Sequence, residues 1–369
     1  MTGRRRYVFS KIFARTCHCS RRKKHLCPSG PSAFFIGMFN PESCCPPRWN
    51  AHDGMPVTMP RRRCLVLHRF SATHLAEIKA KLDVIYVPDT SQQAEAIATH
   101  GNDIDIVLTI GARGLTADEM DAMPRLAFIC ALGAGYERLD VDAARARGIA
   151  LANGAGANDA CVADHAMGLL LAVTRQIPRL DQRVREGGWR EGLPPPASIY
   201  GKRLGIIGLG TIGRQIARRA AGFDLAIGYH NRRQLPDVDH TYFDSAMALA
   251  QWADMLIVAT PGGADTRHIV NADILQALGP RGYLVNIARG SVVDTAALAQ
   301  ALRDNAIAGA GLDVYESEPD APADLIGLHN VVLTPHVAGA SPEAIAATVA
   351  SFLDNAERQA AGQPLRTPI

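Results

Sequence analysis

Three residues that follow predicted strands have side chains suited to the reduction of a carbonyl group. Arg289 follows the apolar run GYLVNIA, Glu318 follows GAGLDVY, and His336 follows VVL. The carboxyl ends of parallel strands meet at one edge of a sheet, so these side chains are expected to converge there. Arg289 can bind a carboxylate with two hydrogen bonds and polarise the adjacent carbonyl. His336 can protonate the carbonyl oxygen, while Glu318 favours and orients the imidazolium.

Each of these residues also has a structural interpretation, because such residues are common in loops and turns. Their joint occurrence at predicted strand ends favours the catalytic interpretation. Asp313, near the end of the GAGLDVY strand, could accept a hydrogen bond from a nicotinamide amide or could cap a turn. The loop Gly133-Ala134-Gly135 follows the strand LAFICAL and could hold a substrate carboxylate on its backbone N–H groups; a structural turn would use the same residues.

A glycine motif indicates the cofactor for such a reduction. Gly208, Gly210 and Gly213 have the spacing G-x-G-x-x-G between a short apolar run and a helical pattern that begins with Thr211 and Ile212. The first glycine permits a tight turn, the second lets the backbone approach a pyrophosphate, and the third lets helix and strand pack closely. The strand–turn–helix context favours a dinucleotide site over a chance glycine-rich turn.

The residues after the next predicted strand indicate which dinucleotide is preferred. Asn231, Arg232 and Arg233 stand where a cofactor without a 2′-phosphate usually meets an Asp or Glu. Two guanidinium groups suit a phosphate, so NADP(H) is expected, with NAD(H) as a second cofactor. A solvated arginine pair is the alternative. Further cofactor contacts are expected where other strands end, at Thr260, Pro261, Ile287, Ala288, Asp313, His336 and Gly339.

The elements that must position these residues alternate between strand and helix patterns from Arg63 onward. This alternation predicts an α/β fold with two Rossmann-like, doubly wound parallel sheets. A long apolar helix at 159–176 is expected to connect the two domains, and an irregular stretch follows it, in which Trp189 is expected to pack. The final helix is expected at 341–359.

Composition fits a two-domain globular enzyme of 369 residues with a small net charge of +3. No apolar run is long enough to span a bilayer, and nothing after the first sixty residues suggests nucleic-acid binding. No metal site is expected. Six of the eight cysteines lie near the start, and the two well-separated ones in the remainder, Cys130 and Cys161, indicate a reduced, cytoplasmic protein.

Residues 1–60 differ from the rest, because they are rich in Arg and Lys and hold no acidic residue before Glu42. The composition would suit a transit peptide, and cysteines 17–27 could suggest a metal site, but their spacing matches no zinc pattern. A disordered tail is the simpler interpretation. A sharper hypothesis is that translation starts at Met55 or Met59, because domain-like patterning begins at Arg63.

From about Arg63 to the end, the chain resembles the D-isomer-specific 2-hydroxyacid dehydrogenases. The motifs that carry the resemblance are GLGTIGRQIARR, VNIARGSVVD, GLDVYESEP and LTPHVAGAS. The resemblance implies that Arg289, Glu318 and His336 are the catalytic residues. It also implies that backbone amides of Gly133, Ala134 and Gly135 bind the substrate carboxylate, together with Arg289.

The resemblance further implies a homodimer and an inserted nucleotide domain, here 158–342, within a substrate domain formed by 61–157 and 343–369. The NRR sequence is similar to that of NADP-preferring glyoxylate and hydroxypyruvate reductases, which overlap with 2-ketogluconate reductases. The expected reaction is therefore NADPH-dependent reduction of a small 2-oxo acid. Asp164 and Glu137 depart from the family pattern, and both are expected to lie apart from the core mechanism.

Two alternatives stay open within this fold. One is a phosphoglycerate dehydrogenase-like enzyme, although the chain ends too soon after the last helix for the regulatory domain that many of those carry. The other is a nucleotide-sensing, corepressor-like binding protein, which would keep the fold and the triad. The complete triad favours an enzyme.

Overall fold

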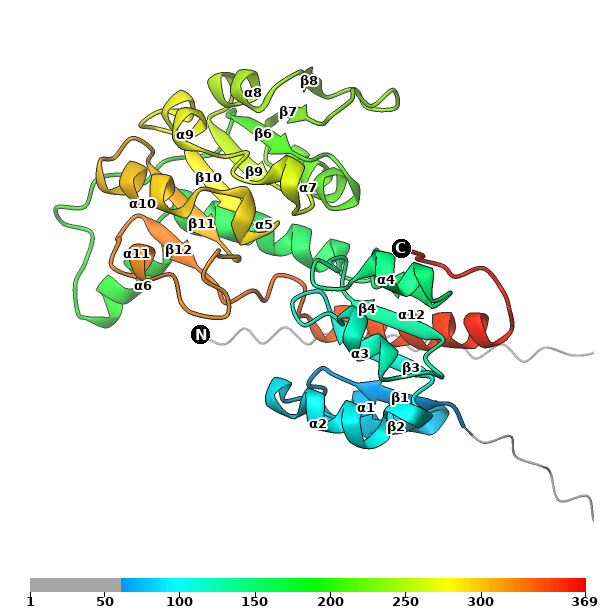
Figure 1. Cartoon of the computed structure of the whole chain (residues 1–369). Helices are drawn as coiled ribbons and strands as arrows, with labels where there is room; N and C mark the ends of the chain where they lie inside the picture. Colours follow the sequence, from blue (N-terminus) through cyan, green and yellow to red (C-terminus); the bar gives the residue numbers. More distant parts are fainter. Residues whose placement is uncertain (1–60) are drawn as a thin grey trace, which may run out of the picture. The chain divides into compact units, whose positions relative to one another are not determined.

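The computed structural model describes residues 61–369, and these residues hold two parallel β-sheets (Figure 1). Residues 1–60, with the cysteine cluster at 17–27 and the alternative start residues, lie outside the described part. Every strand pair in both sheets is parallel, which confirms the predicted α/β class with two doubly wound sheets.

The first sheet has five strands in the order β2-β1-β3-β4-β5. Its order reverses between β1 and β3, which is where open α/β sheets bind ligands. The strands are β1 (Arg63–Val66), β2 (Asp83–Tyr86), β3 (Ile106–Ile110), β4 (Phe128–Leu132) and β5 (Ala150–Asn153). The helices between them are α1 (Ala72–Lys81), α2 (Gln93–His100), α3 (Ala117–Asp121) and α4 (Val141–Ala146).

The second sheet has seven strands in the order β12-β11-β10-β9-β6-β7-β8, and its order reverses between β6 and β9. The strands are β6 (Arg203–Ile207), β7 (Ala226–His230), β8 (Thr241–Phe243), β9 (Met255–Val258), β10 (Tyr283–Asn286), β11 (Gly309–Leu312) and β12 (Val331–Leu333). The helices of this part are α5 (Asp159–Thr174), α6 (Ile177–Arg185), α7 (Thr211–Ala221), α8 (Ala246–Trp252), α9 (Ala272–Leu278), α10 (Thr295–Arg303) and α11 (Ala323–Ile326).

Helices cover both faces of the sheets, so the central strands are mostly buried and apolar, whereas the edge strands β2, β8 and β12 hold no fully buried residue. All four residues of β9 are buried, as are all four of β11. Each fully buried Leu, Ile or Val contributes about 1.5–3 kcal/mol to the free energy of unfolding. Helix α5 contacts α7, β10 and β11, and it buries nine of its sixteen residues. This burial explains why the segment looks apolar on all sides in the sequence.

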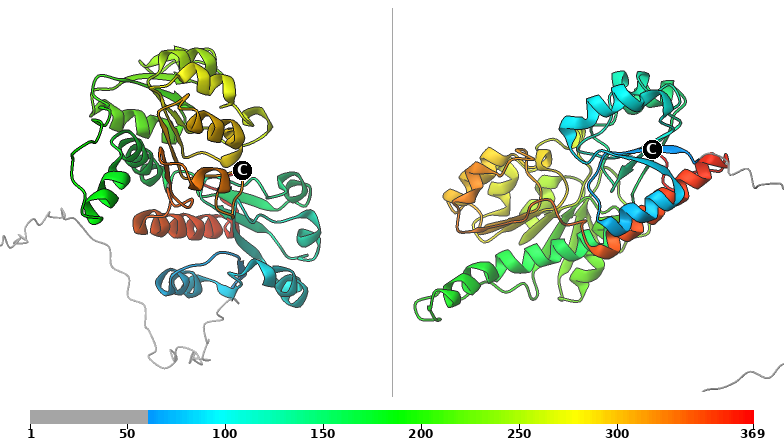
Figure 2. Two further views of the ribbon diagram at one scale, coloured as in Figure 1. Left: turned by 90° about the vertical axis from the view of Figure 1, so that its left-hand side faces the viewer. Right: turned by 90° about the horizontal axis from the view of Figure 1, so that it is seen from below.

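The last helix, α12 (Pro342–Ala360), returns to the first sheet. It contacts α1, β4 and β5, and Figure 2 shows it in red beside the blue α1. The chain thus passes between the sheets twice, once before α5 and once before α12. The two connections touch, because a Cβ atom added at Gly339 would lie 2.4 Å from Nδ2 of Asn158. The return of the last helix agrees with the expected insertion, while the exact domain boundaries stay a prediction.

Two expectations for the stretch after α5 are wrong. The stretch was expected to be irregular, but part of it forms α6, which starts after Gln176 adopts a left-handed conformation with φ of 54°. Trp189 was expected to pack against the protein, but it is 65% exposed. Ile177 and Val184 of α6, and Tyr200 further along, are exposed as well. This segment therefore presents apolar side chains to the surface.

Candidate active site

The three residues predicted to react lie together at the carboxyl ends of adjacent strands. Arg289 follows β10, Glu318 follows β11, and His336 follows β12, and these strands are neighbours in the second sheet. Nδ1 of His336 lies 2.8 Å from Oε2 of Glu318. All three residues line one cavity of about 800 Å³, whose walls come from both sheets. The expected convergence is therefore present in the structure.

Glu318 is held at both carboxylate oxygens. Oε2 faces His336, and Oε1 accepts a hydrogen bond of 2.8 Å from the backbone N–H of Tyr315. Burial acts to raise the pKa of the Glu318 carboxyl, but the hydrogen bonds with His336 and Tyr315 outweigh it, and the pKa lies below its ordinary value. The hydrogen bond with Glu318 raises the pKa of His336, against the opposing effect of burial. The pair therefore favours a carboxylate beside an imidazolium.

A buried aspartate holds the loop that carries His336. Asp313 is 1% exposed, and its Oδ1 accepts hydrogen bonds from Thr334 Oγ1 at 2.6 Å and from the Val337 N–H at 2.9 Å. Its Oδ2 accepts from the Ala338 N–H, also at 2.9 Å. The backbone N–H of His336 donates to the Asp313 carbonyl, and His336 has a φ of 52°. These contacts agree with the turn-cap interpretation of Asp313, and its contact with a nicotinamide stays a prediction.

The glycine loop expected to bind a carboxylate faces Arg289. Gly133, Ala134 and Gly135 all line the cavity. A Cβ atom added at Gly135 would lie only 1.9 Å from Nη2 of Arg289, so the guanidinium rests directly on this loop. The loop N–H groups and the guanidinium thus flank one small space, where a carboxylate could meet both.

The G-x-G-x-x-G motif adopts the expected tight turn at the point where the second sheet reverses its order. Gly208 follows β6 with φ of 99°, a value that L residues rarely adopt. A Cβ at Gly213 would lie 2.2 Å from the Gly208 carbonyl oxygen, so the close packing of α7 requires glycine there. Gly210 has open space around it, and as the N-cap of α7 it has no side chain to cap the helix. The first N–H groups of α7 can therefore meet a pyrophosphate, and the fold suits a dinucleotide.

The residues after β7 divide into a structural one and two exposed ones. Asn231 Oδ1 accepts a hydrogen bond of 2.7 Å from the Leu209 N–H and so ties this segment to the glycine turn. The Arg232 side chain is 91% exposed, and its Nη1 lies 4.0 Å from Asp265. Arg233 is also exposed. Both guanidinium groups are thus accessible to a phosphate in solution.

The other predicted cofactor residues surround the same region. Ile212, Ile287 and Gly339 line the cavity, and a Cβ at Gly208 would meet the backbone N of Thr260 at 2.8 Å. The remaining predicted contacts lie at the start of α7, after β9 and after β10: Thr211, Pro261 and Ala288. Among residues 61–369, no group of three His, Cys, Asp or Glu side chains could hold a metal ion.

Sequence reasoning missed one contact and several wall residues. Glu137 was expected to lie apart from the mechanism, but its Oε1 accepts a hydrogen bond of 2.6 Å from Nε of Arg289. Asp164 does lie elsewhere, where it pairs with Arg219. The missed wall residues lie after β1, at the end of β3, at the N-cap of α5 and on α12: His68, Ile110, Asn158, Ile345 and Thr348. The strand order that brings the ends of β1 and β3 together is known only from the structure.

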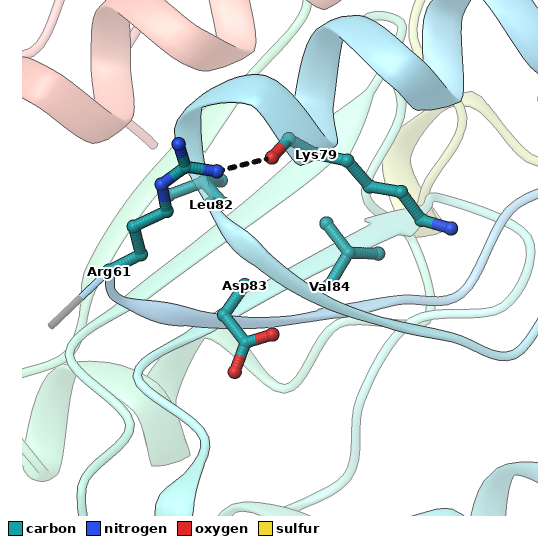
Figure 3. Close-up of a pocket in the computed structure, with 5 residues that line it drawn as sticks. All are labelled: Arg61, Lys79, Leu82, Asp83 and Val84. Atoms are coloured by element: carbon teal, nitrogen blue, oxygen red, sulfur yellow. Dashed lines mark hydrogen bonds between the residues drawn. The ribbon is translucent and has the colours of Figure 1, made fainter.

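A second hollow lies away from this chemistry, on the first sheet (Figure 3). Its lining residues are Arg61, Lys79, Leu82, Asp83 and Val84, and Arg61 Nη1 donates a hydrogen bond of 2.9 Å to the Lys79 carbonyl. Asp83 and Val84 begin β2, so this hollow is at the amino end of that strand. Ligands of such sheets bind at the carboxyl ends, so we place the candidate active site in the larger cavity.

Comparison with known proteins identifies the family. Residues 167–338 match the D-isomer specific 2-hydroxyacid dehydrogenase, NAD binding domain. The hydroxyphenylpyruvate reductase of Plectranthus scutellarioides is 39% identical over 278 residues, which cover 75% of this chain and 89% of that protein. The chain belongs to the D-isomer-specific 2-hydroxyacid dehydrogenase family. It is therefore an oxidoreductase whose second sheet forms a NAD-binding domain.

Two further proteins are also similar. The 2-ketogluconate reductase of Gluconobacter oxydans is 39% identical over 264 residues, covering 71% of this chain and 85% of its own. The solved structure of an NADPH-dependent glyoxylate/hydroxypyruvate reductase from Sinorhizobium meliloti, in complex with NADP and malonate, is 38% identical with a TM-score of 0.78. That match covers 84% of this chain and 97% of the other. Among the residues described for this dehydrogenase, no helix combines the length and apolar character required to cross a bilayer.

Proposed function

We propose that this protein reduces a small 2-oxo acid to the D-2-hydroxy acid with NADPH. The observation that carries the proposal is the His336–Glu318 hydrogen bond of 2.8 Å beside Arg289 in one cavity. A proton donor, its carboxylate partner and a cation for the substrate are what such a reduction needs from the protein.

In the proposed reaction, Arg289 and the N–H groups of Gly133, Ala134 and Gly135 hold the substrate carboxylate. The same guanidinium polarises the 2-oxo group, which lies next to the carboxylate. His336, protonated through its pairing with Glu318, gives its Nε2 proton to the carbonyl oxygen as negative charge develops there. Glu318 keeps the ring oriented and stabilises the imidazolium before transfer. In the opposite direction, His336 accepts the hydroxyl proton.

The cofactor, when bound, supplies the hydride that reduces the carbonyl carbon. We assign its pyrophosphate to the turn of Gly208, Gly210 and Gly213 with the first N–H groups of α7. We assign the 2′-phosphate of NADP(H) to Arg232 and Arg233, both of which are exposed at the end of β7. NAD(H) lacks that phosphate and would bind more weakly.

Glyoxylate, hydroxypyruvate and 2-ketogluconate are the first substrates to test, because similar proteins carry those names. The cavity wall favours a further class. Phe70, Ile110, Leu132 and Ile345 make part of this wall apolar, and a neutral form of His68 is favoured because burial lowers its pKa. An aromatic 2-oxo acid such as hydroxyphenylpyruvate would contact such a wall well, and a relative carries that name too.

We also propose that the protein works as a homodimer in the cytoplasm. Ile177, Val184, Trp189 and Tyr200 are exposed within one short segment, and contiguous exposed apolar residues are typical of protein interfaces. Reduced cysteines agree with the cytoplasm: Cys64, Cys130 and Cys161 are free thiols. Light scattering of the purified protein would test the dimer directly.

The test of function follows the absorbance of NADPH and NADH with the four oxo acids named above, in parallel. We expect faster turnover with NADPH, and His336→Ala should lower kcat about 10²–10⁴-fold while NADPH still binds. Oxidation of 3-phosphoglycerate alone would favour the phosphoglycerate dehydrogenase alternative. Tight cofactor binding without turnover of any oxo acid would contradict the proposal and favour a nucleotide-sensing protein.

A further inference from the structure

We infer that Glu137 is a positioning residue that fixes the guanidinium of Arg289 for the substrate carboxylate. The inference rests on the proposed function of Arg289 and goes beyond it, because it names a residue that acts through Arg289. Glu137 follows β4 of the first sheet, whereas Arg289 follows β10 of the second. The contact therefore joins the carboxylate-binding loop to the strand end that carries the cation.

The guanidinium is held at two of its three nitrogens. Nε donates to Glu137 Oε1 at 2.6 Å, and Nη1 donates to the Ala288 carbonyl at 2.5 Å. Hydrogen bonds between ionised partners are shorter and stronger than neutral ones. An arginine side chain has many rotamers, so two such contacts select one orientation before any substrate arrives.

The selected orientation points the third nitrogen at the proposed carboxylate site. Nη2 lies against Gly135, at 1.9 Å from the position that a Cβ would occupy. Glu137 engages Nε with one oxygen and leaves Nη2 to the glycine loop. Nε is the Arg289 nitrogen that Glu137 bonds, so we assign Glu137 the support of the guanidinium and leave the place of the substrate carboxylate to the oxamate experiment below.

Glycines at three positions, in three different loops, leave the space that the Glu137–Arg289 ion pair occupies. A Cβ added at Gly111 or Gly135 would lie 2.9 Å or 2.7 Å from Oε2 of Glu137. A Cβ at Gly262 would lie 3.0 Å from Cγ of Arg289 and 3.9 Å from Oε1 of Glu137. These glycines follow β3, β4 and β9 respectively. The chain therefore leaves room for this carboxylate at several separate points, and the two side chains remain partly exposed, 31% for Arg289 and 41% for Glu137.

The experiment compares Glu137→Ala with Glu137→Gln in the full chain. Oxamate, an unreactive carboxylate that resembles a 2-oxo acid, serves as the probe, and its binding to the enzyme with NADPH present is followed by fluorescence. Glu137→Ala should weaken oxamate binding, and raise KM for the oxo acid, by about 10- to 100-fold, the value of a charged hydrogen bond. The Kd of NADPH should change by less than about twofold, because Glu137 is expected to act only through Arg289.

Two controls make the result specific to Arg289. Glu137→Gln keeps an oxygen that can accept from Nε but loses the charge, so its oxamate affinity should fall between those of the natural protein and Glu137→Ala. In an Arg289→Ala background, Glu137→Ala should have almost no further effect, because two residues in one contact are not additive. If Glu137→Ala itself unfolds, Glu137→Asp keeps the charge on a shorter side chain and should give an intermediate loss.

Several outcomes would overturn the inference. Tighter oxamate binding in Glu137→Ala would show that Glu137 competes with the substrate. An equal loss of NADPH affinity, full additivity with Arg289→Ala, or a Gln variant as weak as Ala would show a general structural effect. Oxamate binding also separates this inference from the proposed function, since the probe reports on Arg289 even if no oxo acid is turned over.

Discussion

Nδ1 of His336 and Oε2 of Glu318 are 2.8 Å apart, and the other oxygen of Glu318 is fixed by a backbone N–H. The histidine therefore has one ring nitrogen committed to the carboxylate and the other, Nε2, left for the substrate. This arrangement favours the imidazolium form, because the hydrogen bond with Glu318 raises the pKa of His336.

This pairing makes a prediction about pH. Reduction needs protonated His336, so kcat/KM should be constant below the raised pKa of His336 and fall as pH rises through it. In Glu318→Gln the descending limb should move to lower pH, because the carboxylate that raises the pKa of His336 is gone. A pH profile of kcat/KM, recorded with the oxo acid that is reduced fastest, gives the position of this limb in the natural protein and in Glu318→Gln. The reverse reaction, oxidation of the hydroxy acid, is an internal check, because its rate should rise with pH. A descending limb that stays at the same pH in Glu318→Gln would contradict the role given to the His336–Glu318 pair.

A second prediction concerns the preference for NADP(H). Replacing both Arg232 and Arg233 by Ala should raise KM for NADPH by about 10- to 100-fold and leave KM for NADH within about twofold. Arg218→Ala is a matched control, because Arg218 is an exposed arginine on α7 whose Nη2 donates to Gln215. Steady-state kinetics with both cofactors gives the change in KM for NADPH relative to that for NADH. Equal increases in KM for NADPH and NADH would show that Arg232 and Arg233 do not recognise the 2′-phosphate.

A third prediction separates two glycines of one motif. Gly213→Ala should lower the free energy of unfolding by about 1–3 kcal/mol, because its Cβ would lie 2.2 Å from the Gly208 carbonyl oxygen. Gly210→Ala should leave Tm nearly unchanged, because no atom lies within 4 Å of its Cβ position. It should nevertheless weaken NADPH binding at least about tenfold, since the new methyl group meets the pyrophosphate. Thermal unfolding gives Tm and fluorescence titration gives the Kd of NADPH for both variants. If Gly210→Ala and Gly213→Ala changed both quantities alike, the separate roles given to the two glycines would be refuted.

Much of the fold could be predicted from the sequence because buried parallel strands are short apolar runs. The apolar runs at 204–207 and 255–259 correspond to β6 and β9, whose bounds differ from these runs by one residue. Helix α6 could not be recognised, because it buries none of its residues and begins after a left-handed Gln176. Trp189 is exposed for the same reason: nothing within residues 61–369 covers the apolar side chains of this segment.

The site was predictable where topology alone brings residues together. Arg289, Glu318 and His336 follow adjacent parallel strands, so their order along the chain already implies proximity. The contact between Glu137 and Arg289 could not be foreseen, because it joins residues 152 positions apart on different sheets. No local pattern specifies how two separately folded sheets meet, and that arrangement decides which first-sheet loop faces Arg289.

The contact between Gly339 and Asn158 has a mechanical consequence. Both covalent connections between the sheets pass this one point, so we expect any rotation of one sheet relative to the other to take place about it. Atoms close to a pivot move little during rotation, and His336 is only three residues from Gly339. Such a rotation would change the width of the cavity while the proton donor stays nearly in place.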